Sequence, residues 1–137
     1  MKLPGPDHPI TIAPNRKRVR VVLNGRVVAD STRALTLREA SLRPVHYIPR
    51  ADADMGLLVR SPQSTHCPYK GDAAYYSLSV DGRTAENAVW TYEAPYPAMA
   101  AIKDYLAFYP ARVDRIEEVA DEGEQTGMSK QSRPEPR

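Results

Sequence analysis

Apolar and polar residues alternate most regularly just after the proline-rich start of the chain. Residues 18–23 (RVRVVL) place apolar side chains at every second position, which is the pattern of a half-buried strand. Asn24-Gly25 follows, and residues 26–29 form a second run that favours a strand. Because both residues of an Asn-Gly pair tolerate a positive φ, this pair predicts a tight hairpin between two strands.

Short runs of the same kind continue along the chain, separated by turn residues. We expect further strands at residues 34–37, 45–48, 64–67, 73–80 and 84–92, and two more within residues 105–119. A helix through residues 111–119 is the alternative to the last strand. Only two short helices are expected: one in residues 50–59, with Asp52 or Asp54 as N-cap, and one near residues 98–102. The pattern predicts a mostly β fold, a small antiparallel β-domain with one or two short helices.

Proline and apolar content divide the chain into three parts. Residues 1–17 contain four prolines and are predicted to form an extended N-terminal arm, because proline disfavours both helical turns and strand pairing. Residues 18–120 are expected to form a single β-domain. Residues 121–137 contain almost no apolar side chains and are predicted to be a disordered tail.

Charge gives little information about partners. The chain carries 19 basic and 17 acidic residues, and a net charge of +2 argues neither for nor against a partner. Its basic residues are mostly dispersed, so nucleic acid is not an expected partner, and no membrane partner is expected either. No run approaches 18 apolar residues, and the first residues lack the apolar core of a secretion signal, so a cytoplasmic location is expected. A single cysteine, and three histidines without ligand spacing, predict no metal site and no cofactor. The oligomeric state is left open.

The densest group of reactive side chains lies in residues 65–78, THCPYKGDAAYYSL. His66 and Cys67 are neighbours on a predicted strand, so their side chains point to opposite faces. We therefore interpret Cys67 as a buried structural residue, because His66 cannot activate it from the other face. His66 is either a buried, hydrogen-bonded residue or part of a polar site. Lys70 lies in a turn formed with Gly71, where it is a candidate to contact an anion.

Aromatic and acidic residues on the following strands extend this candidate site. Tyr75 and Tyr76 face opposite sides of their strand, so one is expected in the core and the other on a pocket wall. Glu86 and Trp90 lie four positions apart and share a face of a regular strand, although Trp90 is also a natural core residue. The candidate ligand site has the following members: His66, Lys70, Tyr75, Tyr76, Glu86, Trp90, Tyr47 and Arg50. We predict that His66, Lys70, Glu86 and Trp90 surround one cavity.

Several blocks of the sequence resemble a known family. RVRVVLNGRVVADSTRAL, HYIPRADADM, THCPYKGDAAYYSLSV and ENAVWTYEAPYPAMAAIKDYLAFYPARVD resemble successive blocks of the domain of unknown function 427 family. The resemblance implies a fold similar to the β-tent class, which zinc-knuckle proteins and B-type methionine sulfoxide reductases share. It also brings a nucleotidyltransferase label. With one cysteine, this chain departs from those zinc-binding relatives, because it lacks a four-thiolate site.

Three functions are compatible with these residues. The first is a β-domain that binds a small ligand, anionic or nucleotide-like. The second is a nucleotidyltransferase, for which Asp52-Ala53-Asp54 is the only Asp-x-Asp pair, although it falls in a predicted turn or helix rather than on a strand. The third is a module whose aromatic face meets a protein partner. We expect the first.

Overall fold

The computed structural model describes residues 1–120 and consists of strands joined by turns and short 3-10 helices. The strands are β1 (Ile10–Pro14), β2 (Arg18–Leu23), β3 (Arg26–Ser31), β4 (Leu35–Glu39), β5 (Val45–Tyr47), β6 (Leu58–Cys67), β7 (Gly71–Val80), β8 (Arg83–Tyr92), β9 (Leu106–Phe108) and β10 (Arg115–Val119). The 3-10 helices are η1 (Arg50–Asp52), η2 (Met55–Leu57), η3 (Pro97–Ile102) and η4 (Pro110–Arg112). The predicted mostly β fold is confirmed.

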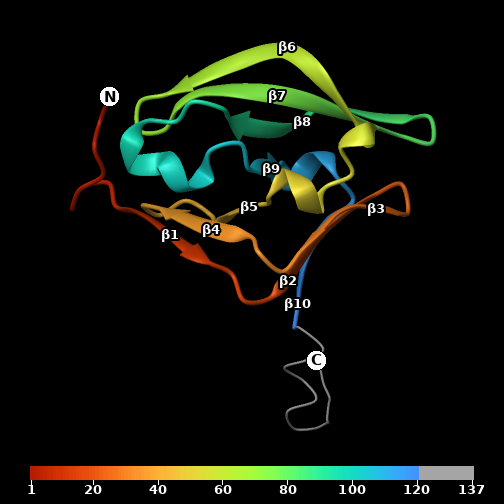
Figure 1. The fold of residues 1–137 in the computed structure, drawn as a ribbon, viewed down its shortest axis with the longest axis horizontal. Helices are drawn as coiled ribbons and strands as arrows, with labels where there is room; N and C mark the ends of the chain where they lie inside the picture. The colour runs from red at the N-terminus through yellow and green to blue at the C-terminus, as the bar shows by residue number, and fades with distance from the viewer. Residues whose placement is uncertain (121–137) are drawn as a thin grey trace, which may run out of the picture.

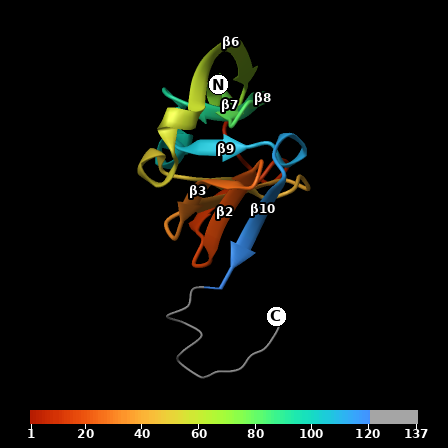
Figure 2. The same cartoon turned by 90° about the vertical axis from the view of Figure 1, so that its right-hand side faces the viewer.

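The strands form three antiparallel sheets. One sheet has the order β6-β7-β8-β9, a second β1-β4-β5 and a third β10-β2-β3. The four-stranded sheet lies above the two smaller ones (Figure 1), and a quarter turn shows it again above β2, β3 and β10 (Figure 2). The consecutive pairing of β6, β7 and β8 is the order expected from their short connections.

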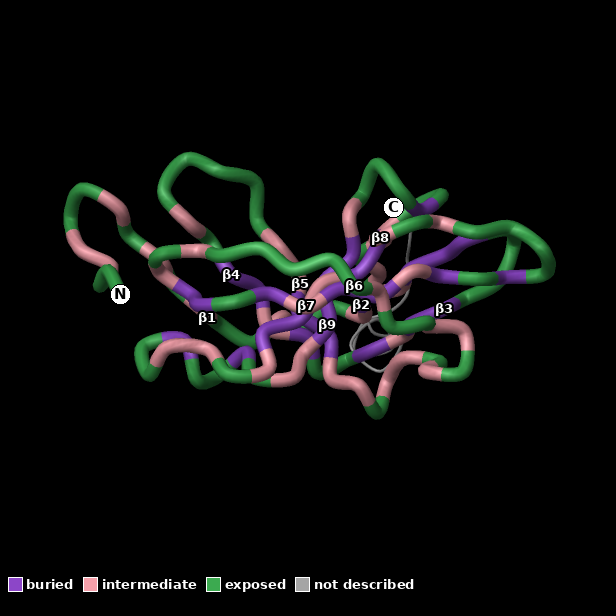
Figure 3. The backbone as a smooth tube through the Cα atoms, turned by 90° about the horizontal axis from the view of Figure 1, so that it is seen from above, coloured by how far each residue is buried: buried purple, intermediate pink, exposed green. Residues whose placement is uncertain are grey.

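The two smaller sheets pack against different side chains of the four-stranded sheet. One buried cluster joins Val19, Val21 and Val28 of β2 and β3 to Tyr76 and Leu78 of β7. The other cluster joins β4 and β5 to different residues of β7 and β8; its members include Leu37, Tyr47, Ala73, Tyr75 and Tyr92. Tyr75 and Tyr76 are neighbours in sequence and belong to different clusters, as alternation along a strand requires. Strand β6, by contrast, forms an almost continuous exposed edge (Figure 3).

Two segments differ from the sequence-based expectation. The N-terminal arm is not only extended: residues 10–14 pair with β4 as strand β1. The pairing is possible because β1 is an edge strand and its proline stands at its last position. Residues 111–119 contain strand β10 rather than a helix. The predicted tail, residues 121–137, lies outside the described residues.

The short helices fall where the sequence predicted them. Within residues 50–59 there are two 3-10 helices, and the Asp54 side chain caps the second by accepting a hydrogen bond from the Gly56 backbone N–H at 3.2 Å. Helix η3 covers residues 97–102. No helix in residues 1–120 has the length and apolar character needed to cross a lipid bilayer.

The contribution of the Asn24-Gly25 turn to stability can be tested by substitution in the hairpin between β2 and β3. Asn24 and Gly25 have φ values of 54° and 77°, so both occupy the left-handed region. A Cβ at Gly25 would meet no atom within 4 Å, so backbone strain alone should set the cost of Gly25→Ala. We expect a loss of about 1 kcal/mol in the free energy of unfolding, measured with urea.

Gly5→Ala is the matched control for this prediction. A Cβ at Gly5 also has open space around it, and Gly5 lacks a positive φ. This variant should stay within about 0.5 kcal/mol of wild type. Equal losses in the two variants would show that the turn conformation is not the cause.

Candidate functional site

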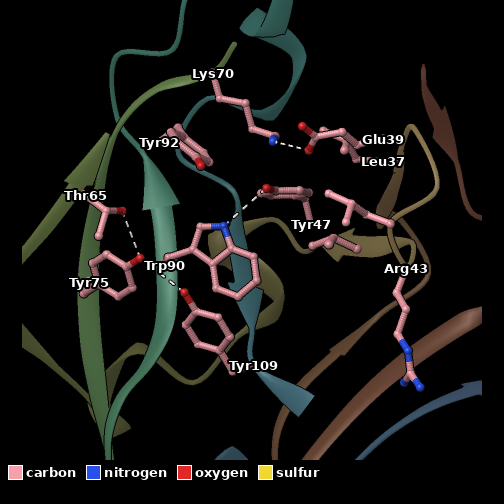
Figure 4. Close-up of a pocket in the computed structure, with 12 residues that line it drawn as sticks. Leu37, Glu39, Arg43, Tyr47, Thr65, Lys70, Tyr75, Trp90, Tyr92 and Tyr109 are labelled. Atoms are coloured by element: carbon pink, nitrogen blue, oxygen red, sulfur yellow. Dashed lines mark hydrogen bonds and ion pairs between the residues drawn. The ribbon is translucent and has the colours of Figure 1, made fainter. Parts of the chain in front are cut away.

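A cavity of about 290 Å³ lies between β7 and β8 on one side and β4 and β5 on the other (Figure 4). Five aromatic residues line it: Tyr47, Tyr75, Trp90, Tyr92 and Tyr109. Lys70 and Glu39 lie at one end, and Arg43 extends from the loop between β4 and β5. The cavity is therefore aromatic along its walls and charged at the end formed by Lys70 and Glu39, whereas the exposed Arg43 side chain points away from it (Figure 4).

Strand register explains why these side chains point to the same space. Tyr75 of β7 pairs with Trp90 of β8, and Ala73 pairs with Tyr92, so all four share one face of the sheet. Tyr47 of β5 faces them from the other sheet and forms part of the same buried cluster. Two antiparallel sheets that each present one face thus enclose the cavity.

The aromatic rings contact one another around Trp90. The rings of Trp90 and Tyr109 are 4.3 Å apart between centroids, and Tyr47 meets Trp90 edge-on at 6.3 Å. The indole Nε1–H of Trp90 donates a hydrogen bond to the Tyr47 hydroxyl at 3.3 Å. On the other side, the Tyr75 hydroxyl is hydrogen-bonded to those of Thr65, at 3.0 Å, and Tyr109, at 3.2 Å. These contacts hold the aromatic wall in a fixed geometry.

An ion pair forms the charged end of the cavity. The Lys70 Nζ lies 2.5 Å from Oε1 of Glu39, and Oε2 of Glu39 lies 2.7 Å from Nε2 of His8. His8 in turn stacks on Tyr69, with ring centroids 4.1 Å apart. Burial opposes ionisation of Glu39, but the hydrogen bonds and charges of Lys70 and His8 outweigh it and lower the pKa of Glu39. Glu39 therefore stays ionised at neutral pH.

Burial has the opposite consequence for the tyrosines. It raises the pKa of both Tyr47 and Tyr92 well above 10, and together with the hydrogen bond between Tyr109 and Tyr75 it raises the pKa of Tyr109 to about 12. These phenols keep their protons at neutral pH. They can donate hydrogen bonds, but they are not poised to act as bases or nucleophiles.

Comparison with known families gives one match. The sequence model of DUF427, described as a domain of unknown function and carrying a nucleotidyltransferase label, matches residues 11–119. The chain belongs to the DUF427 family. No curated protein matches the chain.

The structure of this DUF427 protein brings together four of the predicted site residues. Lys70, Tyr75, Trp90 and Tyr47 all line the cavity. Gly71 has a φ of 113°, so the predicted turn is present. Lys70 differs from a typical turn lysine because it is only 7% exposed, turned inward by its pairing with Glu39.

The other four predicted members do not line the cavity. Two of them are His66 and Glu86, so their expected grouping with Lys70 and Trp90 around one cavity is wrong. His66 is exposed on the opposite face of β6, where its Nδ1 lies 2.7 Å from the carboxylate of Asp72. Glu86 is also exposed and does not line the cavity. Alternation fails between Glu86 and Trp90 because the register of β7 and β8 shifts there and Asn87 adopts a φ of 51°.

Arg50 and Tyr76 form a separate cluster on the other face of the sheet. The Arg50 guanidinium donates hydrogen bonds to the Tyr76 hydroxyl at 3.0 Å, to Thr91 Oγ1 at 3.3 Å and to the Asp104 backbone carbonyl at 2.7 Å. With its donors engaged in this way, Arg50 connects the β5–η1 segment to the sheet. It is not part of the cavity.

Cys67 lies on the same strand face as Thr65, half-buried against the cluster that surrounds the cavity. Its Sγ is 3.8 Å from the Lys70 Nζ.

The sequence analysis missed Glu39, because only the pairing of distant strands brings it to Lys70. Tyr92 could have been found, since it lies two positions after Trp90 on the same predicted strand.

The Asp-x-Asp pair of this DUF427 protein is engaged by arginines. Asp52 binds Arg33 at 2.8 Å and the hydroxyl of Ser31 at 2.7 Å. Asp54 binds Arg26 at 3.1 Å in addition to capping η2. Within residues 1–120, no three His, Cys, Asp or Glu side chains gather as a metal site would require.

The ion pair at the end of the cavity should be coupled energetically. Lys70→Met would leave the Glu39 carboxylate, whose side chain is 13% exposed, with His8 as its remaining partner. Losing one partner of a fully buried pair costs about 3–5 kcal/mol, and we expect about 2 kcal/mol here because His8 remains. Chemical denaturation of Lys70→Met, Glu39→Gln and the double variant measures the coupling.

The double variant Lys70→Met/Glu39→Gln should lose only about half as much free energy of unfolding as Lys70→Met, because no unpaired charge is left. The effect should also depend on pH. The pKa of Glu39 is lowered in the folded state, so its stabilisation is full above the ordinary value of 4.5 and disappears as the pH falls through the folded value. The difference in free energy of unfolding between wild type and Lys70→Met should therefore shrink as the pH falls below about 4.5. A difference that stays constant from pH 7 to pH 3 would contradict this origin.

Proposed function

We propose that this protein binds a small, planar organic molecule in the aromatic cavity. The observation that carries the proposal is an open space walled by Trp90, Tyr109 and Tyr47 with the Lys70–Glu39 pair at its end. Protein cores are close-packed, so an aromatic cavity with a few converging polar groups is the usual form of a ligand site. Planar rings bind such walls by stacking or edge contacts.

Size and charge narrow the ligand class. A volume of about 290 Å³ lies just below the usual range for small-molecule sites, about 300–1,000 Å³, and supports a ligand of one or two rings. The Lys70–Glu39 pair is neutral overall, and Arg43 adds a positive charge at the rim of the cavity, which favours an anionic or nucleotide-like molecule with its ring inside. As part of the same proposal, we place the protein in the cytoplasm, on the basis of its single cysteine.

The nucleotidyltransferase alternative rests on the family label rather than on the geometry. That chemistry commonly uses closely placed acids that hold two metal ions, and the carboxylates of Asp52 and Asp54 are instead paired with arginines. Release of pyrophosphate from nucleoside triphosphates with Mg²⁺ would favour the enzyme. An interaction module would bind a protein partner without any effect of small molecules.

Trp90 provides a site-specific test, because it is the only tryptophan in the chain. Its indole N–H gives a single nitrogen–proton NMR signal from the cavity wall. Quinoline-2-carboxylate, a planar anionic probe, should shift this signal in a saturable manner. Tyr109→Leu removes one stacking surface and should weaken binding about fivefold.

His66→Ala is the matched control, because His66 lies on the opposite face of β6. Its affinity for the probe should equal that of wild type. An indole signal that does not move at millimolar probe, or an equal loss of affinity in His66→Ala and Tyr109→Leu, would refute the proposed site.

A further inference from the structure

The hydroxyl of Tyr92 has no hydrogen-bond partner in the part of the chain that the structure describes. Tyr92 is only 6% exposed, and its oxygen points into the cavity between Lys70 and Tyr47 (Figure 4). The ring of Tyr92 is buried, but its hydroxyl oxygen is not among the fully buried polar atoms of residues 1–120, so it is reached through the cavity. This group is therefore available to a ligand.

The Tyr47 hydroxyl is only partly satisfied. It accepts a hydrogen bond from the indole of Trp90, but no acceptor for its own proton is found among residues 1–120. The hydroxyls of Tyr75, Tyr109 and Thr65, by contrast, are bonded to one another. The hydroxyl oxygens of Tyr47 and Tyr92, which carry these unused protons, lie at the Lys70 end of the cavity and not at the Tyr75 end (Figure 4).

This end of the cavity has an excess of donors over acceptors. Burial keeps both phenols protonated by raising the pKa of Tyr47 and of Tyr92. Lys70 has three N–H donors and two contacts, Glu39 and the sulfur of Cys67. The two carboxylate oxygens of Glu39 already contact Lys70 and His8, so its negative charge is balanced where the donors converge.

From this arrangement we infer that the ligand places an oxygen acceptor, a carboxylate or carbonyl attached to its planar ring, between the hydroxyls of Tyr47 and Tyr92. Lys70 lies beside the same position and would add a third donor. The inference rests on the proposed function and names the chemistry that the site selects. A site whose hydrogen-bond donors converge on a ligand acceptor discriminates strongly against ligands that lack that acceptor.

Three probes of the same shape test the inference: quinoline-2-carboxylate, quinoline-2-carboxamide and 2-methylquinoline. Binding is measured through the Trp90 indole signal. The two oxygen-bearing probes should bind at least about tenfold tighter than 2-methylquinoline, as expected for one or two hydrogen bonds in a buried site. Preference for the carboxylate over the carboxamide would identify the acceptor as anionic; equal affinities would identify it as a carbonyl oxygen.

Tyr92→Phe removes the unpaired hydroxyl and keeps the ring. This variant should bind the two oxygen-bearing probes about tenfold more weakly than wild type does, and its affinity for 2-methylquinoline should be unchanged. Tyr75→Phe is the control, because the Tyr75 hydroxyl is already bonded to Thr65 and Tyr109 and lies away from Lys70. It should preserve the ranking of the three probes.

The possible failures are distinguishable. If 2-methylquinoline binds as tightly as the carboxylate, or if Tyr75→Phe abolishes the discrimination as Tyr92→Phe does, the inference is overturned while the proposed function stands. If none of the three probes moves the indole signal, the proposed function falls and the inference with it.

Discussion

The buried ion pair of Lys70 and Glu39 is the contact on which the arrangement of this site depends. Lys70 ends the turn between β6 and β7, and Glu39 is the last residue of β4, so their 2.5 Å contact joins the four-stranded sheet to the β1-β4-β5 sheet. The same lysine accepts a backbone hydrogen bond from Tyr96 at 2.9 Å, and His8 joins the N-terminal segment to Glu39. Three distant parts of the chain therefore meet at one pair of charges, which fixes the spacing of the two sheets at the cavity.

A charged pair joins two sheets differently from an apolar contact. Apolar side chains can repack at similar energy, whereas a buried lysine needs its carboxylate within hydrogen-bond distance. Beyond the pair, the facing surfaces are occupied by large rigid rings that meet edge-on or tilted, such as Tyr47, Trp90 and Tyr109. Hydrogen bonds among Tyr75, Tyr109, Tyr47 and Trp90 restrict the orientations of these rings around the cavity.

The strands could be predicted from local sequence patterns, whereas the site depends on which distant strands come to face each other. Alternation and the Asn24-Gly25 turn predicted the β2–β3 hairpin, and alternation correctly separated Tyr75 from Tyr76. It failed for Glu86, because a register shift around Asn87 interrupts the period of two that the prediction assumed. Glu39 could not be predicted as the partner of Lys70, since 31 residues separate them and no local pattern encodes which sheets will face each other.

The Tyr92 side chain contributes to folding through its ring. The ring packs in the buried cluster around the cavity. The hydroxyl makes no hydrogen bond within residues 1–120 and its oxygen is accessible from the cavity, so folding gains no hydrogen bond between protein groups from it. Under the proposed function its contribution lies in the bound state, where a ligand acceptor satisfies the hydroxyl. A ligand that binds only the folded form then raises the free energy of unfolding, and above its Kd this increase grows with the logarithm of ligand concentration.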